Sequence, residues 1–341
     1  MPRPTVHDIA KDAGVSLATV DRVLNKRPGV RAGTIARVHD AIDRLGYVRD
    51  MAAANLARQK DYEFVFVVPD GPSSFLRKLN EVIEEARGRA RIDRMTISTL
   101  RVPPNDPHAL VQALEGLDVE QVDGIAIMAP ETPQVRDAIR HLKENDISVV
   151  AIVSDLPSSE IDQFVGINNV AAGRTAGHLL GGFLGPQPSE VLVLAGSMQA
   201  RDHAERRLGF DQIMAEKYPH LRVLPTIEAW DDTELVEQLV PAALARHPET
   251  VGIYSLGAGN AGLYNVLQQI GGDRLTVVAH ELTEVSRKAL LDDSFDVIIA
   301  QDVGHVVRSA IRMMKANRDM HEVIPSQEKI RIEVIVKENL M

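Results

Sequence analysis

Short runs of β-branched residues alternate with amphipathic stretches over most of this chain of 341 residues. The runs have the length of strands, and the stretches between them repeat apolar residues at helical spacing. The sequence predicts strands within residues 64–68, 96–100, 124–128, 149–153, 191–194, 252–254, 276–278 and 297–300. It predicts helices within residues 75–89, 133–144, 174–184 and 261–270. Strands and helices that take turns form right-handed βαβ units, in which helices cover both faces of a parallel sheet.

The number of strands favours two lobes over one. About ten strands are more than a single sheet comfortably holds. We therefore expect two doubly wound parallel-sheet lobes, near residues 61–160 with 299–325 and near 161–298 with 326–336. Ligands of such folds bind outside the carboxyl ends of the strands, so a cleft between the lobes is the expected ligand site. Two motifs that bind nucleotide phosphates, GxxxxGK(S/T) and a GxGxxG that follows a strand, do not occur in the chain. This favours a small polar ligand over a nucleotide.

Residues 4–25 carry a second pattern, in which small apolar residues are spaced to pack two short helices at a steep angle. These apolar positions are Ile9, Ala10, Ala13, Val15, Val20, Val23 and Leu24. Between the helices, Gly14 can adopt the positive φ of a tight turn, and the Ser16 hydroxyl can cap the second helix. The side chains left facing outward are Leu17, Ala18, Thr19, Asp21, Arg22 and Asn25. A helix-turn-helix presents such residues to the major groove of DNA; the alternative is a small three-helix interaction module.

The formal charge is divided unevenly along the chain. Residues 1–60 contain eleven Lys and Arg residues and six Asp residues, a formal charge of +5, whereas the whole chain carries −10. The remaining residues therefore carry −15. A basic segment is attracted to phosphate through counterion release and an acidic body is repelled, so double-stranded DNA is expected to meet the N-terminal segment.

Composition limits the class of protein. Hydrophobic residues make up 45% of the chain, and no apolar run is as long as a membrane span. The N-terminal segment differs from a secretory signal, which favours a cytoplasmic protein without a membrane partner. The chain has no Cys, which excludes disulfides and thiolate metal sites. We predict neither a metal nor a cofactor.

Three features together carry a family resemblance: the segment TVHDIAKDAGVSLATVDRVLN at 5–25, LGYV at 45–48, and the two-lobe pattern of the body. Over essentially its full length the chain resembles the LacI/GalR (lactose-repressor) family of bacterial transcription factors. The resemblance implies a helix-turn-helix domain at residues 1–50, a hinge helix or linker at 51–60, and a ligand-binding body at 61–341 that is similar to periplasmic sugar-binding proteins. It implies a homodimer or a tetramer on a pseudo-palindromic operator. Repression relieved by the ligand is the habit of the family, but the residues leave the sign of control open.

In the family, residues at the start of the second helix read bases, and these positions fall on Leu17, Ala18 and Arg22. Arg22 can pair with a guanine through two hydrogen bonds, whereas the other two offer apolar contact to a thymine methyl. The remaining positions of this domain predicted to contact DNA are Thr5, Ser16, Thr19 and Asn25. Asp21 replaces the small hydroxyl residue usual in the family, so it either accepts a hydrogen bond from cytosine N4 or pairs with a nearby Arg.

Residues 51–57 match the hinge helix that the family folds on its operator. Leu56 occupies the position of the Leu that wedges into the central minor groove, and Ala53 and Ala57 are small enough to let two hinge helices approach. Arg49 replaces the usual Pro, so the operator geometry can differ from that of other members. The alternative is a helical linker with a buried Leu.

Sugar sites combine polar side chains, which bind hydroxyls, with aromatic rings, which pack on the C–H faces of the sugar. The resemblance implies that Trp230 and Phe75 are two opposed aromatic plates; ordinary core packing is the alternative for both. It implies that Arg206 binds ligand hydroxyls. The neighbouring Arg207 is expected in solvent, because adjacent helix positions do not share a face.

The other ligand contacts implied by the resemblance are Asp155, Glu281, Gln301, Asn105 and Asn260. Asp155 follows a strand beside Ser154, and a helix cap or turn is its alternative role. Glu281 replaces the usual Asp, and His280 is expected to support a contact residue rather than touch the ligand. Two acids and one Arg around apolar plates favour a sugar, sugar alcohol or amino-sugar-like ligand over a sugar phosphate.

Three other functions remain as alternatives. An enzyme is not favoured, because the acids and His residues form no nucleophile elbow, HExxH motif or triad pattern. A transport-linked binding protein agrees with the body but not with the N-terminal domain. An architectural DNA-bending protein with an unused cleft predicts no ligand effect on DNA affinity. The sequence therefore predicts a sequence-specific transcriptional regulator whose operator affinity depends on a carbohydrate-like effector.

Overall fold

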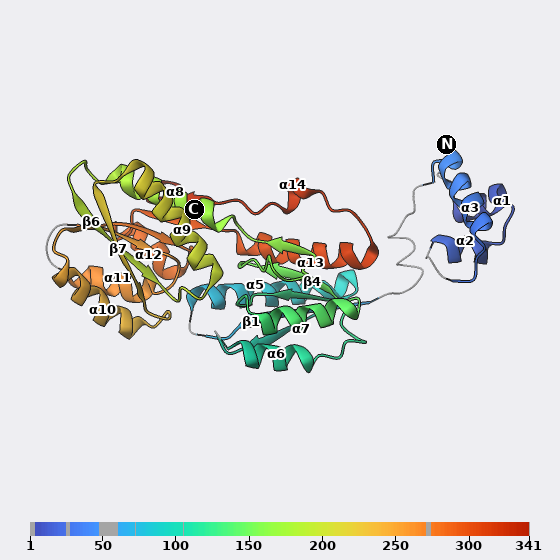
Figure 1. Ribbon diagram of the computed structural model, residues 1–341, viewed down its shortest axis with the longest axis horizontal. Coiled ribbons are helices and arrows are strands. Elements are labelled where there is room, and N and C mark those ends of the chain that lie inside the picture. The colour runs from blue at the N-terminus through green and yellow to red at the C-terminus, as the bar shows by residue number, and fades with distance from the viewer. Residues whose placement is uncertain are drawn as a thin grey trace. The chain divides into compact units, whose positions relative to one another are not determined.

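The computed structural model of the chain divides into two compact units, Met1–Lys60 and Asp61–Met341 (Figure 1). Within these units the structure describes residues 4–24, 28–47, 61–71, 73–104, 106–270 and 274–340. None of the helices in these ranges has both the length and the apolar character that crossing a bilayer requires.

Three helices make up the described part of the N-terminal unit: α1 (Val6–Ala13), α2 (Leu17–Leu24) and α3 (Ala32–Leu45). The first helix opens with a capping box, in which the Thr5 hydroxyl accepts from the Asp8 N–H and the Asp8 carboxylate accepts from the Thr5 N–H. Gly14 ends this helix with a φ of 63°. Ser16 Oγ then accepts from the N–H of Thr19 at the start of α2. The turn at Gly14 and the Ser16 cap predicted from the sequence are confirmed.

A small apolar core joins the three helices. Its buried members are Ile9, Ala13, Val20, Val23, Val38 and Ala41. Three further predicted positions, Ala10, Val15 and Leu24, are partly buried against this core. Arg44 of α3 also pairs with Asp12 of α1 at 2.6 Å. The predicted helix-turn-helix packing is therefore confirmed.

The body begins with a five-stranded parallel sheet in the order β2-β1-β3-β4-β5. Its strands are β1 (Tyr62–Pro69), β2 (Met95–Val102), β3 (Gly124–Ile127), β4 (Ser148–Ile152) and β5 (Gln163–Val165). Alternate residues of β1 enter opposite cores. Phe64 and Phe66 pack with α5 (Ser74–Ala90) and α13 (Val303–Asp319), whereas Val65 and Val67 pack with α6 (Pro107–Glu115) and α7 (Pro133–Glu144). Helices thus cover both faces of this sheet, which defines the first lobe (Figure 1).

The second lobe has a six-stranded sheet in the order β11-β10-β9-β8-β6-β7, parallel except between β10 and β11. The strands are β6 (Ser189–Ala195), β7 (Leu221–Glu228), β8 (Thr250–Ser255), β9 (Thr276–His280), β10 (Val297–Ala300) and β11 (Glu333–Ile335). One face packs with α8 (Asn169–Phe183) and α9 (Arg201–Lys217). The other packs with α10 (Thr233–Arg246), α11 (Asn260–Gln269) and α12 (Glu284–Leu291). Both lobes are therefore doubly wound, as predicted.

The chain crosses between the lobes after β5, after β10 and again after α13. The last crossing carries a short helix, α14 (Pro325–Glu328), and returns the chain to the second sheet as β11. The first sheet continues to residue 165 before the first crossing, and the second sheet continues to residue 300 before the second crossing, so these exchange points differ by a few residues from those expected at 160 and 298. The strands continue past the predicted boundaries because β5 pairs with β4 and all of β10 pairs within the second sheet.

Two glycines bring α8 and α9 into close contact. A Cβ on Gly173 would lie 1.9 Å from the carbonyl oxygen of Arg206, and a Cβ on Gly209 would lie 1.9 Å from that of Val170. No residue with a Cβ fits at these two positions without moving a helix backbone. The close contact fixes the position of α9, which carries Arg206.

The environment of Arg207 corrects one prediction. This side chain was expected in solvent, but its Nε lies 2.8 Å from the Asp211 carboxylate and its guanidinium donates to the Leu224 carbonyl at 3.3 Å. It also donates to the Thr226 hydroxyl. Arg206 and Arg207 do face different sides of α9, as expected. The side that carries Arg207, however, packs against β7 and is not open to solvent.

Candidate functional site

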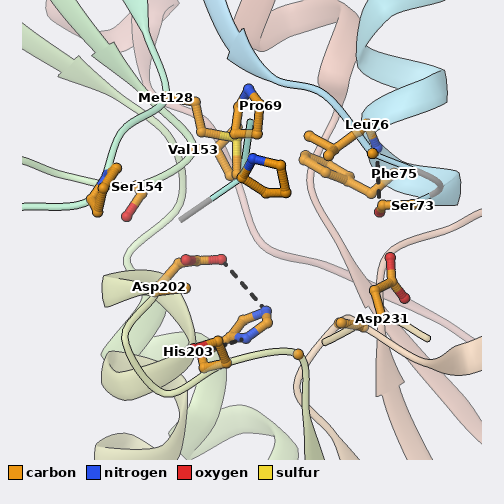
Figure 2. A pocket seen from close by; sticks show the side chains of 18 of the residues that line it. Pro69, Ser73, Phe75, Leu76, Met128, Val153, Ser154, Asp202, His203 and Asp231 are labelled. Atoms are coloured by element: carbon orange, nitrogen blue, oxygen red, sulfur yellow. Dashed lines mark hydrogen bonds and ion pairs between the residues drawn. The ribbon is translucent and has the colours of Figure 1, made fainter. Parts of the chain in front are cut away.

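A cleft with a volume of about 180 Å³ lies between the lobes at the carboxyl ends of their strands. The wall from the first lobe is mainly apolar and includes Pro69, Met128 and Val153 (Figure 2). The wall from the second lobe carries the charged groups, which are Asp202, His203, Arg206, Asp231 and Glu281. This division allows one lobe to pack on the body of a ligand while the other binds its polar groups.

Strained backbone is concentrated in this cleft. Val153, Trp230, Asp231 and Glu281 all line it, and all have positive φ, between 50° and 70°. A positive φ is a clear outlier for a β-branched residue such as Val153. Strain of this kind persists where the surrounding structure fixes it, and it clusters at functional sites.

Arg206 anchors the polar wall and is 1% exposed. Its Nε donates to Asn169 Oδ1 at 2.9 Å, and the other two guanidinium nitrogens donate to the Leu256 carbonyl at 2.7 Å and to Glu281 Oε1 at 3.1 Å. Gly257 leaves room for this arrangement, because a Cβ there would lie 2.7 Å from the Arg206 guanidinium. The predicted Arg and the predicted Glu therefore meet as a buried ion pair facing the cleft.

Glu281 links this pair to a third predicted residue. Gln301 Nε2 donates to Glu281 Oε1 at 3.4 Å, while Gln301 itself does not line the cleft. Burial raises the pKa of Glu281, although the positive charge of Arg206 and its hydrogen bond oppose the rise. The buried Gln301 Oε1 has no hydrogen-bond partner within the described ranges.

The two predicted aromatic plates both border the cleft and come from different lobes. Phe75 lies in the first turn of α5 and is 9% exposed, whereas Trp230 follows β7 and is 52% exposed. The N–H of Trp230 donates to the Gly196 carbonyl at 2.8 Å, which holds its backbone against the end of β6. An exposed indole beside a buried ring is available for stacking on a ligand.

Three of the predicted ligand contacts do not line the cleft. Asp155 instead accepts a hydrogen bond from the N–H of Leu156 at 2.7 Å. Asn260 binds the Ser255 hydroxyl at 2.7 Å and the His280 carbonyl at 2.8 Å, and borders a neighbouring pocket. Gln301 reaches the cleft only through Glu281. A fourth, Asn105, lies outside the described residues.

His280 lies behind the cleft, in the supporting position expected for it. It is fully buried, and its Nε2 lies 2.8 Å from the hydroxyl of Tyr254, which stacks on Phe210. Burial, reinforced by the positive charge of Arg206, lowers the pKa of His280 well below its ordinary value. The ring is therefore neutral near pH 7.

Three titratable residues of the cleft, Asp202, His203 and Asp231, were not predicted from the sequence as ligand contacts (Figure 2). Asp231 follows the predicted Trp230, and the other two belong to α9. Both lie in the first turn of α9, and Asp202 lies one helical turn before Arg206, on the same face. This i, i+4 spacing from a predicted ligand-binding Arg was the available signal. Ser154, which was expected to assist, also lines the cleft.

One ion pair joins the two lobes beside the cleft. Arg201 at the start of α9 lies 2.8 Å from Glu131, which precedes α7 in the first lobe, and 2.8 Å from Glu205. The Glu131 carboxylate also accepts from the N–H of Ser158 at 2.7 Å. Burial opposes the ionisation of Glu131, but the bonds from Ser158 and Arg201 outweigh it and lower its pKa. The bridge therefore contains a carboxylate and holds the lobes together at this edge.

The face of α2 that was predicted to read bases is available to solvent. Leu17 is 42% exposed, and Ala18 and Arg22 are exposed as well. The hydroxyls of Ser16 and Thr19 lie 2.8 Å apart at the start of the helix. Asn25 and the predicted hinge positions Ala53, Leu56 and Ala57 lie outside the described residues.

The described residues contain no group of three or more His, Asp or Glu side chains placed to share a metal ion.

A helix-turn-helix unit with an exposed second helix can bind DNA, and a two-lobe body with a cleft can bind a small ligand; together they characterise the class of DNA-binding regulators that sense a ligand. The chain belongs to the periplasmic binding protein domain family, whose model matches residues 64–319, and its N-terminal unit matches the model of the lacI family of bacterial regulatory proteins over residues 5–50. It is thus a DNA-binding transcriptional regulator, and the predicted family is confirmed.

Similar proteins agree with this assignment. Catabolite control protein A of Priestia megaterium is 26% identical over 303 residues, which cover 82% of this chain and 86% of that protein. The HTH-type transcriptional regulator DegA of Bacillus subtilis is 28% identical over 216 residues, 63% of this chain and 61% of that protein. An ABC transporter solute-binding protein of Burkholderia graminis, solved in complex with D-arabinose, has a TM-score of 0.74 and 26% identity over 82% of this chain and 96% of its own.

Proposed function

We propose that this chain binds an operator through α2 and that a carbohydrate-like effector, bound between the lobes, changes its operator affinity. The proposed base-reading residues are Leu17, Ala18 and Arg22. The proposed effector contacts are Phe75, Arg206, Trp230 and Glu281. The role is binding and not catalysis, in line with relatives that are named as regulators or as a solute-binding protein.

The observation that carries the proposal is the composition of the cleft. Each lobe supplies an aromatic ring, Phe75 from one and Trp230 from the other, and the second lobe adds the buried pair of Arg206 and Glu281. A ligand that contacts both walls binds best at one separation of the lobes. Effector binding and lobe arrangement are therefore coupled, and a coupling of about 1–3 kcal/mol changes DNA affinity about 5- to 150-fold.

A second copy of the chain completes the DNA-binding form in this proposal. A two-fold dimer places two copies of α2 in successive major grooves of a pseudo-palindromic site. Residues 51–57 would then fold on the operator as a hinge, with Leu56 entering the minor groove. We propose repression, relieved by the effector, in the bacterial cytoplasm.

The test uses the full chain and duplexes tiled across the DNA upstream of its coding sequence. Fluorescence anisotropy at moderate salt measures the affinity of each duplex and of a scrambled duplex of equal composition. We expect one duplex to bind at least about 10³-fold more tightly than the scrambled one, and a sugar or polyol to change that affinity. Equal affinity for all duplexes, with and without every sugar tried, would contradict the proposal.

A further inference from the structure

The carboxylate of Asp202 lines the cleft without a hydrogen bond. Its side chain is 8% exposed, and no described residue donates to it within hydrogen-bond distance. The nearest cationic or titratable nitrogens are those of His203 at 3.9 Å and Arg206 at 4.0 Å. A mostly buried carboxylate that lacks protein donors is costly, so water in the free cleft, or a polar group of a ligand that displaces this water, completes its hydrogen bonding.

Arg206 lies 4.0 Å from Asp202, at ion-pair distance, but donates no hydrogen bond to it. Its guanidinium already donates to Asn169, to the Leu256 carbonyl and to Glu281. The residues that line the cleft include three carboxylates, those of Asp202, Asp231 and Glu281, against one guanidinium. The cleft is therefore negative whether Glu281 is ionised or protonated.

His203 presents a second acceptor beside Asp202. Its Nδ1 lies 3.2 Å from the Ser197 carbonyl, which can only accept, so Nδ1 carries the proton. Burial lowers the pKa of His203. The negative charge of Asp202 opposes this effect, and the positive charge of Arg206 adds to it. In the neutral ring Nε2 is an acceptor, and it faces the Asp202 carboxylate at 3.9 Å. The two acceptors therefore face each other, 3.9 Å apart (Figure 2).

We propose that Asp202 and His203 bind a protonated amino group of the effector, which makes the effector an amine-bearing sugar or polyol. This inference rests on the proposed function, because it concerns the same cleft. A nitrogen about 2.8 Å from both acceptors can donate one hydrogen to each. A hydroxyl has a single hydrogen and satisfies only one of the two. The apolar groups Pro69, Met128 and Val153 of the opposite wall then pack on the carbon skeleton of the effector.

Calorimetry on the full chain near neutral pH tests the proposal with matched ligand sets. Each set contains a hexosamine, the parent hexose and the N-acetylated hexosamine in the gluco, galacto and manno series; glucamine and sorbitol form an open-chain pair. We expect at least one amine to bind at least tenfold more tightly than its hydroxyl and N-acetyl counterparts. Asp202→Asn should reduce this preference to less than threefold.

Asp211→Asn is the matched control. Asp211 lies on the same helix, pairs with Arg207 and is 45% exposed outside the cleft, so this variant should keep the full preference for the amine. If Asp202→Asn fails to fold, the comparison of amines with their hydroxyl and N-acetyl counterparts on the unaltered chain still tests the preference for an amine.

Two outcomes would overturn the inference. They differ in whether the proposed carbohydrate effector is refuted as well. Hexoses that bind as tightly as their hexosamines, or an amine preference that persists in Asp202→Asn, refute the amine subsite and leave a carbohydrate effector in place. The absence of binding by every member of every set refutes both the subsite and the carbohydrate effector.

Discussion

One fully buried histidine, His280, and one mostly buried histidine, His203, make the body sensitive to acid. Burial lowers the pKa of His280 and of His203 in the folded chain. In the unfolded chain both rings titrate near the ordinary value of about 6.5. The unfolded state therefore binds more protons as the pH falls below about 6.5, and the free energy of unfolding decreases with the pH in this range. Glu281, whose pKa is raised by burial, acts in the opposite direction.

The variant His280→Gln should lose part of this acid sensitivity. Removal of the ring eliminates its proton uptake on unfolding, so the difference in free energy of unfolding between about pH 7.5 and pH 5.5 should shrink. Denaturant titration of the body at the two pH values measures this difference. The exposed His141→Gln variant should behave like the unaltered chain. An unchanged pH dependence in His280→Gln would contradict the burial argument.

Arg22 gives a second prediction at the scale of single residues. Its side chain is exposed on α2, so Arg22→Ala should leave the thermal stability of the N-terminal unit unchanged. If Arg22 reads a guanine, the variant loses about 1–3 kcal/mol of operator affinity and relaxes specificity at one base pair. Anisotropy with single-base variants of the operator measures this. Equal weakening on all duplexes would make Arg22 a phosphate contact instead.

The sequence predicted individual site residues unevenly, for a physical reason. Arg206, Glu281, Phe75 and Trp230 come together in the cleft because each directly follows a strand or lies in the first turns of a helix after one. Asp155 also follows a strand, yet the local turn to Leu156 uses its carboxylate. Whether a side chain enters a cleft depends on backbone details such as the positive φ of Glu281, which residue spacing does not encode.

At the scale of elements, the close contact between α8 and α9 depends on glycine. Gly209→Ala places a Cβ 1.9 Å from the Val170 carbonyl oxygen. Because backbone must move, we expect a loss of about 1–3 kcal/mol or more in the free energy of unfolding. Denaturant titration checks the loss, and the shift of α9 should also weaken effector binding.

Gly88→Ala is the control for that substitution. Gly88 lies in α5, is exposed, and has no atom within 4 Å of the added Cβ. Alanine is the better helix former, so this variant should gain about 0.5–1 kcal/mol. A similar gain in both variants would show that helix propensity, and not close packing, governs both positions.

The strands that the sequence did not predict share one position in the fold. The strands β5, β7 and β11 all lie at sheet edges. Edge strands are less buried than central ones, so they lack the continuous apolar run that identified β1, β6 and β9. In β7, Pro225 lies where the pairing with β6 shifts register between Val191 and Val193, as expected for Pro in a strand. Central strands are predictable from burial, whereas three of the four edge strands depend on the neighbour with which they pair. The fourth, β2, was predicted from the β-branched residues within 96–100.

At the scale of the whole molecule, the bridge between Glu131 and Arg201 connects lobe arrangement to effector binding. Glu131→Gln removes the charge that holds the two lobes together at this edge. We expect the dissociation constant of the effector to rise about 1.4- to fivefold, which corresponds to the 0.2–1 kcal/mol of a partly exposed pair. Calorimetry on the full chain measures the change.

The control for this variant removes a salt bridge within one lobe. Glu216 pairs with Arg174 at 3.1 Å, between α9 and α8, so Glu216→Gln should leave effector affinity unchanged. Unaltered affinity in Glu131→Gln would mean that the bridge does not favour the ligand-bound arrangement.

The central claim is that one ligand site and one DNA site on this chain are energetically linked. Linkage is reciprocal: if the effector changes operator affinity by a given factor, the operator changes effector affinity by the same factor. The decisive experiment therefore measures two pairs of affinities. Calorimetry gives the affinity for the effector with and without saturating operator duplex, and the change is compared with the change in operator affinity on adding the effector. The account predicts the same factor in both, within about 5- to 150-fold. Effector affinity that is identical on free and operator-bound protein would contradict it.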